Sequence, residues 1–476
     1  MKISEIFNLE KSQPELDFVD IDVEIDTPLF IDPFFLGLKK DNWSTEASNT
    51  IRNFFQRVIN LIRDGDLENA KQLFIHLHEP NSTCLGVSRG TPQGRGVGSV
   101  GTDGIFRSIL ESRAIQSGLI EDLEDNILFV DGFGKDKLSD MTTNIIRKHL
   151  IEYTIGQCKL HGIPMQSDVP SEFYWNRGTN RWERELCDSL VIDGKKILLV
   201  PKGAVSFCRN YIPQNYYQHY VLNFMQNEHL QMSHSPLVKR RMDETPYVTK
   251  KDLIEIHPFS KAFIANFTRS NPEVLENFKR ETKTTSLANE ELDDVNIEEL
   301  INHLIDKLES IEPGNAGATE YHRTIMGVLE ILFYPHLIYP SLEQEIHEGR
   351  KRIDLTFDNA ATDGIFFRLH NSMGISCQYM MVECKNYSSD PTNPELDQLS
   401  SRFSPNRGRV GFLLCRTIDD LDRFISRCRD TYTDQRGLII PLTDGDVITL
   451  LRNHNDWNST FIERFLSDRV RQITIN

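Results

Sequence analysis

The sequence of 476 residues lacks several patterns that mark whole classes of protein. No apolar run reaches the roughly 18 residues that a membrane-spanning helix needs, which argues against an integral membrane protein. The first ten residues contain no apolar segment of the kind found in signal peptides. Eight cysteines are present, but none forms a Cys-x-x-Cys pair, which argues against a disulfide framework or a structural zinc site. These absences together predict a cytoplasmic protein.

Positive charge is also in short supply. The chain carries 53 lysines and arginines against 70 aspartates and glutamates, a formal net charge of −17. Because non-specific binding to nucleic acid depends on lysine and arginine contacts to phosphates, this balance argues against a protein that coats nucleic acid. Residues 398–418 are an exception, since they contain four arginines and no acid. A solvated arginine face is the simpler interpretation of this stretch, and a local positive field is the alternative.

What is present is an ordinary globular composition, with 39% hydrophobic and 26% charged residues. A chain of this length exceeds one compact core and suits two or three domains. We expect an α+β N-terminal region over residues 1–265, with a division near residue 165 as an option. A helical connector is expected over 266–315, because glycine and proline interrupt the pattern at its end. The C-terminal domain would then cover 316–476.

The N-terminal region shows strand-like and helix-like segments in turn. Residues 18–25 alternate in polarity with period two, which predicts a strand. We predict helices over 47–64 and 66–77, and further strands over 127–130 and 196–200. This mixture favours an α+β arrangement that recognises a target, a partner or a trigger.

A glycine-rich loop in this region matches a well-known pattern. The run Gly96-Val97-Gly98-Ser99-Val100-Gly101 reads G-x-G-x-x-G, as in dinucleotide-binding folds. Such a site also needs an apolar strand directly before the loop, whereas Gly90-Thr91-Pro92-Gln93-Gly94-Arg95 precedes this one. We therefore predict a flexible loop and no organic cofactor. A phosphate-contacting loop, which would make the N-terminal region itself an enzyme, stays open as an alternative.

From residue 317 onward the pattern becomes regular. An apolar helix over 319–333 is followed by strands that later alternate with helices. This order favours a mixed sheet covered on both faces. The segments that we predict are strands 342–347, 351–357, 366–369, 378–386, 410–415 and 438–442, and helices 393–403, 418–430 and 446–452.

Three charged residues interrupt the apolar strands of this domain. Asp354 lies in one predicted strand, and Glu383 and Lys385 lie in another. A lone carboxylate is costly to bury unless something pairs with it or neutralises it. Since residues i and i+2 of a strand face the same side, Glu383 and Lys385 share a face, and Asp354 can point at that face if the strands pair. Two carboxylates and a lysine in this arrangement suggest a divalent metal, a reacting water and phosphodiester hydrolysis.

The spacing of these residues resembles the PD-(D/E)xK signature of restriction-endonuclease-like nucleases. Asp354, then Glu383-Cys384-Lys385, corresponds to the D…ExK part, and Ile353 stands where the signature has proline. The gap between Asp354 and Glu383 is long, so an insertion must be looped out or add a strand. A charged edge strand is the structural alternative, but the apolar residues before Glu383 favour a central strand.

Two further residues extend the resemblance, which covers about residues 317–455. Glu320 on the leading helix resembles an additional acidic residue that many members carry, and Gln398 resembles a glutamine found in a large subset. The resemblance implies a C-terminal core of order α-β-β-β-α-β, with a mixed central sheet flanked by helices. It further implies that Asp354 and Glu383 are metal ligands for Mg²⁺, with Mn²⁺ as an option, and that Glu320 is a further metal ligand or a positioning residue. Lys385 would orient the water or stabilise the transition state, and Gln398 would be a positioning residue.

We therefore expect a Mg²⁺-dependent endonuclease that cleaves DNA more readily than RNA, in restriction or anti-phage defence. A catalytically inactive nuclease fold that binds nucleic acid or a partner is the alternative, as is an RNA-cleaving enzyme. Expected partners are nucleic acid, and optionally a second copy of the chain or another protein of a defence system, but no membrane. The residues that we select as contacts to nucleic acid are Arg350, Lys351, Arg352, Arg402, Arg407 and Arg409.

Overall fold

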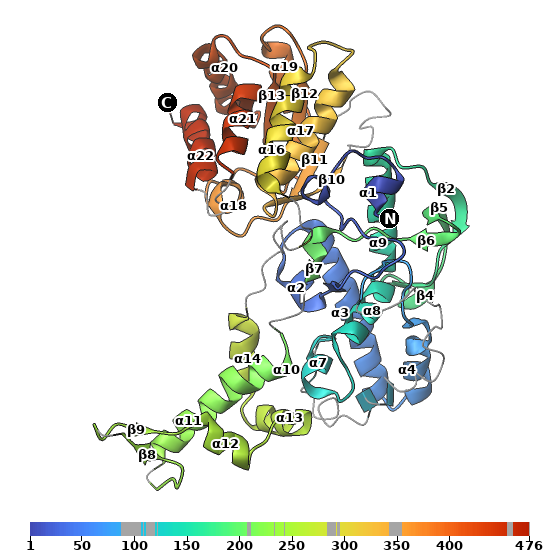
Figure 1. Ribbon diagram of the computed structural model, residues 1–476, viewed down its shortest axis with the longest axis vertical. Helices are drawn as coiled ribbons and strands as arrows, with labels where there is room; N and C mark the ends of the chain where they lie inside the picture. The colour runs from blue at the N-terminus through green and yellow to red at the C-terminus, as the bar shows by residue number, and fades with distance from the viewer. Residues whose placement is uncertain are drawn as a thin grey trace.

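The computed structural model describes residues 1–86, 106–107, 109–110, 120, 122–206, 211–232, 234–241, 243–282, 292, 296–341, 355–454 and 460–475. Figure 1 shows the C-terminal domain at one end of an elongated molecule, the first 206 residues in the middle and a helical arm at the other end. The described residues form a mixed α/β structure with a C-terminal mixed sheet. The predicted glycine-rich loop lies outside the described residues.

The first part of the chain is mainly helical. Its longest helix is α3, whose first turn is capped because the Asp41 side chain accepts a hydrogen bond from the Ser44 amide at 2.8 Å. The helices are α1 (Ile3–Ile6), α2 (Pro33–Leu38), α3 (Asn42–Arg63), α4 (Leu67–Leu73), α7 (Asp125–Phe129), α8 (Lys135–Ile145) and α9 (Arg147–His161). The strands are β1 (Phe30–Ile31), β2 (Gln166–Pro170), β3 (Tyr174–Asn176), β4 (Arg181–Glu183), β5 (Leu186–Ile192), β6 (Lys195–Ile197) and β7 (Val205–Ser206).

Three predicted strands are wrong. Residues 18–25 form only isolated bridges, and residues 18–21 are all buried, so the alternation in polarity does not reflect a two-faced strand. Residues 127–130 lie largely within helix α7, because a short apolar run does not distinguish a strand from a buried helix. Residues 366–369 belong to helix α18, which buries Ile365, Phe366 and Leu369 along one side.

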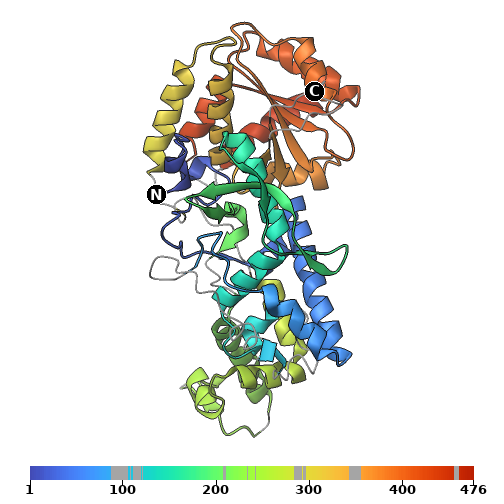
Figure 2. The same ribbon diagram turned by 90° about the vertical axis from the view of Figure 1, so that its right-hand side faces the viewer.

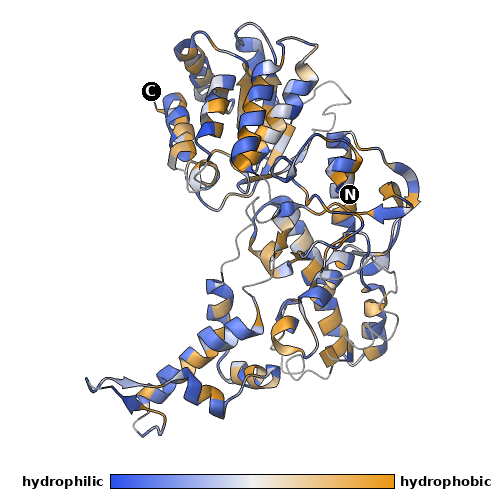
Figure 3. Ribbon diagram, in the orientation of Figure 1, coloured by the Kyte–Doolittle hydropathy of each residue, from blue (hydrophilic) through white to orange (hydrophobic). Residues whose placement is uncertain are grey.

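A helical arm follows the first part of the chain. Figure 1 shows it extending away from the other regions and ending in a two-stranded hairpin. Figure 3 shows hydrophobic and hydrophilic residues alternating along its helices, as expected for amphipathic helices. Its elements are α10 (Pro213–Asn215), the π-helical turn Tyr216–Val221, α11 (Leu222–Gln231), β8 (Lys239–Arg240), β9 (Pro246–Tyr247), α12 (Lys250–Ile256), α13 (Lys261–Ser270) and α14 (Pro272–Glu281).

The C-terminal domain contains a five-stranded sheet in the order β10-β11-β12-β13-β14. The pairs β10–β11 and β11–β12 are antiparallel, whereas β12–β13 and β13–β14 are parallel. Its strands are β10 (Leu337–Ser341), β11 (Leu355–Asn359), β12 (Tyr379–Lys385), β13 (Val410–Cys415) and β14 (Leu438–Thr443). Strand β10 was not predicted, and the predicted strand 342–347 lies outside the described residues.

Helices cover both faces of this sheet, as Figure 2 shows. Helices α16, α17 and α21 contact one another, and α20 and α22 pack together against β14. The helices are α16 (Ile297–Ser310), α17 (Ala318–Phe333), α18 (Gly364–Asn371), α19 (Asn393–Ser400), α20 (Leu421–Thr433), α21 (Asp444–Arg452) and α22 (Thr460–Thr474). The predicted mixed sheet with two covered faces is therefore present.

A buried polar cluster joins the C-terminal domain to the first part of the chain. The Lys202 ammonium lies 3.2 Å from Oε2 of Glu330 on α17, and both side chains are at most 1% exposed. Asp17 accepts a hydrogen bond from the Tyr153 hydroxyl at 2.6 Å and from the Tyr339 amide at 3.0 Å. Burial raises the pKa of both Asp17 and Glu330, although Lys202 opposes the shift. We call these three charged residues, Asp17, Lys202 and Glu330, the junction cluster.

Candidate active site at the end of strand β12

Glu383 and Lys385 lie near the carboxyl end of the central strand β12. The strand pairs with β11 on one side and β13 on the other, so the prediction of a central strand is confirmed. The alternating residues Val382 and Cys384 are buried in the hydrophobic core. Glu383 is only 1% exposed. A carboxylate in that position needs partners, because burial of an unpaired charge is strongly unfavourable.

Those partners include two residues that the sequence had selected. The Lys385 ammonium donates to Glu383 Oε1 at 2.7 Å and to Gln398 Oε1 at 3.1 Å. The Gln398 amide also donates to Glu383 Oε1, so the three side chains close a ring of hydrogen bonds. Strand periodicity sets Glu383 and Lys385 on one face. The structure therefore brings together three of the five predicted catalytic residues.

Helix α19 supplies Gln398 to this ring. The helix begins with a capping box in which the Thr392 amide donates to the Glu395 carboxylate at 2.7 Å. Leu396 and Leu399 on its inner side are buried in the core. Gln398 lies between them in sequence and is half-buried, so its amide reaches the site from the edge of the helix.

Arg402 is the fourth side chain of this site, and the sequence had predicted a different role for it. Its guanidinium Nη1 lies 3.7 Å from Glu383 Oε2, and its side chain is only 4% exposed. The sequence suggested a contact to nucleic acid, whereas burial directs this cation toward Glu383. Two cations, Lys385 and Arg402, thus face the two oxygens of one buried carboxylate. The sequence contains no indication that Arg402 is buried, because the arginines around it suggest a solvated face.

The start of helix α17 is fixed against the end of β12. The Asn386 side-chain amide donates to the carbonyls of Glu312 and Gly314 at 2.9 Å each, and the Gly314 amide donates to the Asn386 carbonyl at 2.6 Å. Gly317 allows this approach, since a Cβ there would lie 2.4 Å from the Glu312 carbonyl oxygen. Glu320 lies exposed in the first turn of α17. Within the described part of the chain, no hydrogen bond or ion pair joins Glu320 to Glu383 or Lys385.

The carboxyl ends of the neighbouring parallel strands carry a polar trio that sequence reasoning missed. Arg416 follows β13 and Asp444 follows β14, with Arg416 Nε 3.1 Å from Asp444 Oδ2. The Tyr321 hydroxyl on α17 donates to Asp444 Oδ1 at 2.8 Å. Burial raises the pKa of Asp444 to about 6, although Tyr321 and Arg416 both oppose the shift. Ligands of open α/β sheets bind at such strand ends, and that rule could have drawn attention to both residues.

The other predicted residues lie elsewhere or outside the described residues. Arg407 and Arg409 precede Val410, the first residue of β13, whereas Lys385 pairs with Cys415 at the strand's other end. Arg409 instead lines a separate cavity of about 710 Å³ with Arg429 and Tyr432. As contacts to nucleic acid, both stay predictions. Asp354, Arg350, Lys351 and Arg352 lie outside the described residues.

The donors at the site match a hard cation only in part. Among the described residues, no group of three or more histidine, cysteine, aspartate or glutamate side chains could hold a metal ion. The site itself offers the Glu383 carboxylate and the Gln398 amide oxygen, which are ligand types that Mg²⁺ accepts. Mg²⁺ commonly takes one or two protein carboxylates and completes its shell with water and phosphate oxygens.

Comparison with known proteins identifies one family model. It is described as a domain of unknown function, DUF8370, and it matches residues 8–212, which is less than half of the chain. No curated protein and no solved structure gives a significant match. The matched segment includes Asp17 and Lys202 of the junction cluster but none of the residues of the candidate active site. Among the described residues, no helix is long and apolar enough to cross a membrane.

Proposed function

We propose that the chain is a Mg²⁺-dependent endonuclease that hydrolyses phosphodiester bonds of DNA. The observation that carries the proposal is the hydrogen-bonded ring of Glu383, Lys385 and Gln398 at the carboxyl end of a central, buried strand. In this proposal residues 316–476 form a restriction-endonuclease-like core. The element order α17-β10-β11-α18-β12-α19-β13 supports that assignment, because it follows the α-β-β-β-α-β order of the resemblance apart from helix α18, which is inserted between β11 and β12.

The proposal assigns the second carboxylate to Asp354. Thr356 lies opposite Met381 in the register between β11 and β12. Asp354 precedes Thr356 by two residues and Glu383 follows Met381 by two residues. In an antiparallel pair these two steps run in the same direction along the sheet, so strand periodicity supports Asp354 as a partner of Glu383. Glu320, in the first turn of α17, would act from the edge of the site as a further ligand or positioning group.

Each residue of the proposed site then has a role in the reaction. Glu383 and Asp354 would hold Mg²⁺, or Mn²⁺ in its place, and the bound ion supplies charge neutralisation and a more acidic water. Lys385 would orient that water and stabilise the negative charge that develops on the phosphate. Gln398 would hold the Lys385 ammonium in place through its amide oxygen. Arg402 would fix the Glu383 carboxylate from its other side.

The biological role in restriction or anti-phage defence rests on the resemblance alone. Many nucleases of this type act there, and fold-level analogy is the only support for extending that role to this chain. The binding partners in the proposal are therefore DNA and, optionally, other proteins of a defence system. RNA is the alternative substrate, because the described residues do not distinguish the two sugars.

One observation favours a second candidate, a nuclease fold that binds nucleic acid without cleaving it. Glu383 already faces two cations, Lys385 and Arg402, within one buried group. A metal ion would have to compete with both for the same carboxylate, which lowers its affinity. In this second candidate the cations serve to balance Glu383, and the protein needs no metal.

The deciding experiment measures cleavage by the full-length protein with Mg²⁺ or Mn²⁺. Double-stranded DNA, single-stranded DNA and RNA are compared as substrates, and chelation of the metal should stop cleavage. We expect Lys385→Met to lower the DNA cleavage rate about a hundredfold or more, because it removes transition-state stabilisation at the reacting phosphate. The matched control is Lys148→Met, which removes a partly exposed lysine paired with Glu185 at 3.3 Å.

The outcomes separate the candidates. Cleavage that depends on metal and on Lys385, but not on Lys148, supports the endonuclease. Cleavage of RNA but not of DNA supports the alternative, an RNA-cleaving nuclease. Undiminished cleavage by Lys385→Met contradicts the assignment of the site. Binding of DNA without cleavage of any substrate supports the second candidate.

A further inference from the structure

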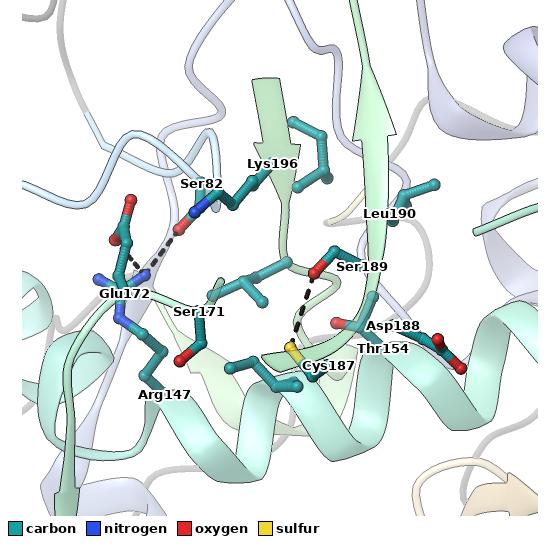
Figure 4. A pocket seen from close by; sticks show the side chains of 13 residues that line it. Ser82, Arg147, Thr154, Ser171, Glu172, Cys187, Asp188, Ser189, Leu190 and Lys196 are labelled. Atoms are coloured by element: carbon teal, nitrogen blue, oxygen red, sulfur yellow. Dashed lines mark hydrogen bonds and ion pairs between the residues drawn. The ribbon is translucent and has the colours of Figure 1, made fainter. Parts of the chain in front are cut away.

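A small cavity lies in the part of the chain that the family model matches, away from the candidate active site. Its walls come from helix α9, strands β5 and β6, and the residues that follow β2. Its volume is about 30 Å³, room for about two water molecules or one small polar group. Apolar side chains of Ile151, Leu190 and Ile197 form much of the lining. Figure 4 shows the cavity with the helix α9 beneath it.

The main polar group of this cavity is the guanidinium of Arg147, which is only 2% exposed. Its Nη2 donates to Asn144 Oδ1 at 2.6 Å, and its Nη1 donates to Ser82 Oγ at 3.3 Å. Among the described residues, no acceptor reaches its Nε. Buried N–H groups of native proteins nearly always find an acceptor, so an arginine with a spare donor is a place where a ligand can bind.

Glu172 shows what kind of ligand this arginine takes. Its Oε2 lies 2.5 Å from Arg147 Nη1, yet its side chain is 41% exposed. Figure 4 shows Glu172 and Ser82 on the same side of the cavity as the guanidinium, with Ser189 and Cys187 across from them. The Glu172 carboxylate is therefore an oxyanion held by the chain itself, on a side chain that can turn into solvent. An incoming oxyanion with matching geometry can replace it.

Further polar groups extend the site around this arginine. The hydroxyls of Ser171 and Ser189 line the cavity, and so does Asp188, whose carboxylate adds to the competition from Glu172. The Lys196 ammonium, also at the cavity, donates to the Pro170 carbonyl at 2.6 Å, and two of its three protons stay available for other acceptors. Arginine recognises carboxylate and phosphate oxygens in pairs, and lysine adds a point charge.

We propose that this cavity binds the oxyanion group of a small ligand, either a phosphate or a carboxylate, through Arg147. Lys196 and the serine hydroxyls contribute further donors, and the body of the ligand stays outside the cavity, which has room only for the oxyanion group. Glu172 competes with the ligand for Arg147 and so limits its affinity. The site lies in the N-terminal region, outside the C-terminal domain, so the proposal does not rest on the endonuclease function.

The test measures binding of inorganic phosphate and, separately, of acetate to the full-length protein by calorimetry in a buffer without other oxyanions. We expect one saturable site for at least one of the two probes, and the probe that binds identifies the head group. Glu172→Gln should tighten that binding about tenfold, because it removes the competing negative charge. Lys196→Met should weaken it several-fold. Neither variant alters a buried residue, so both are expected to fold, which circular dichroism checks.

The matched control is Glu46→Gln, because Glu46 forms a similar arginine pair outside the cavity. Arg177 Nη2 lies 2.9 Å from its Oε2, and the two side chains are 43% and 42% exposed. This variant should leave the affinity for the probe unchanged. Absence of saturable binding to both probes would overturn the proposal, as would an equal gain from Glu46→Gln and Glu172→Gln. Since no arm measures cleavage, failure of the endonuclease proposal would not affect this result.

Discussion

Two buried groups of lysine and carboxylate side chains differ in their surroundings more than in their chemistry. At the end of β12, Lys385 retains 10% of its side-chain surface in solvent, and half-buried Gln398 completes the ring around Glu383. In the junction cluster, Lys202 and Glu330 have at most 1% exposure. The first group lies at the carboxyl end of β12 and keeps some access to solvent, and the second is closed between two parts of the chain. Access to solvent thus separates a site suited to chemistry from one suited to holding the structure together.

The balance of charge differs between the two groups in the opposite sense. Glu383 faces two cations, Lys385 and Arg402. In the junction cluster, Lys202 is the main cation that opposes two carboxylates, Asp17 and Glu330, whose pKa values burial raises, and Lys39 and Lys11 contribute less. Loss of a lysine therefore has different consequences in the two places. In one it leaves a carboxylate beside a remaining arginine, and in the other it leaves two buried acids without their main cation.

The largest effect is expected from Lys202→Met. Breaking a buried ion pair by removing one partner commonly costs about 3–5 kcal/mol, because the other charge stays buried. Here two acids lose their main opposing cation, and we expect a loss of unfolding free energy in that range. Urea unfolding, followed by circular dichroism, measures it.

Two variants calibrate this result. Lys148→Met removes a lysine whose partner Glu185 is 38% exposed, like the lysine itself, and should cost less than about 1 kcal/mol. Glu330→Gln leaves Asp17 to oppose the Lys202 ammonium, so its cost should stay below that of Lys202→Met. If all three variants lose the same stability, the junction cluster is no more important than a surface ion pair.

An intermediate effect is expected from the pH dependence that Asp444 introduces. Its pKa rises from 3.8 to about 6 in the folded protein, so the folded state binds more protons than the unfolded state between these values. The unfolding free energy should therefore fall as the pH rises from about 4 to 6, by up to about 3 kcal/mol. Asp444→Asn cannot titrate, and its stability should decline less over this window. Urea unfolding of both proteins at pH 4.5 and 6.5 gives the comparison.

This prediction also tests the balance at the polar trio. Arg416, at 3.1 Å from the carboxylate, should lower the pKa of Asp444, whereas burial raises it. We expect burial to prevail, because the side chain is only 15% exposed. If the unfolding free energies of the wild type and Asp444→Asn change equally between pH 4.5 and 6.5, the effect of Arg416 exceeds that of burial, and Asp444 stays ionised over this range.

The sequence predicted one of the two compared groups and missed the other for a physical reason. Glu383 and Lys385 lie two residues apart in a strand, so local periodicity was enough to place them on one face. Gln398, on the next helix, was selected from the resemblance to a nuclease family and not from periodicity. Lys202 and Glu330 belong to distant segments, and no local pattern indicates that they pair. The same limit explains Arg402, because its burial depends on how the turn after α19 packs.

Secondary structure was predictable where a segment is long and periodic. Helix α3 and strands β13 and β14 match their predicted positions within a few residues. The failures are short apolar or alternating runs, such as 127–130, whose period does not distinguish helix from strand. Strand parity predicted which face of the sheet Asp354 and Glu383 would share. It could not predict which residues of the two strands lie opposite each other.

The smallest effect on stability is expected from Lys385→Met, the variant that should lower the cleavage rate about a hundredfold or more. Arg402 stays 3.7 Å from the Glu383 carboxylate, and the Gln398 amide continues to donate to it. Lys385 is also the most exposed of the cations in the two groups, so its removal should change the unfolding free energy by about 1 kcal/mol or less. Stability and cleavage measured on one preparation then separate the two groups. If Lys385 serves the chemistry, its variant should lose cleavage activity and keep its unfolding free energy. A loss of unfolding free energy near that of Lys202→Met would instead assign Lys385 a structural role. That outcome would favour the second candidate, which binds nucleic acid without cleaving it.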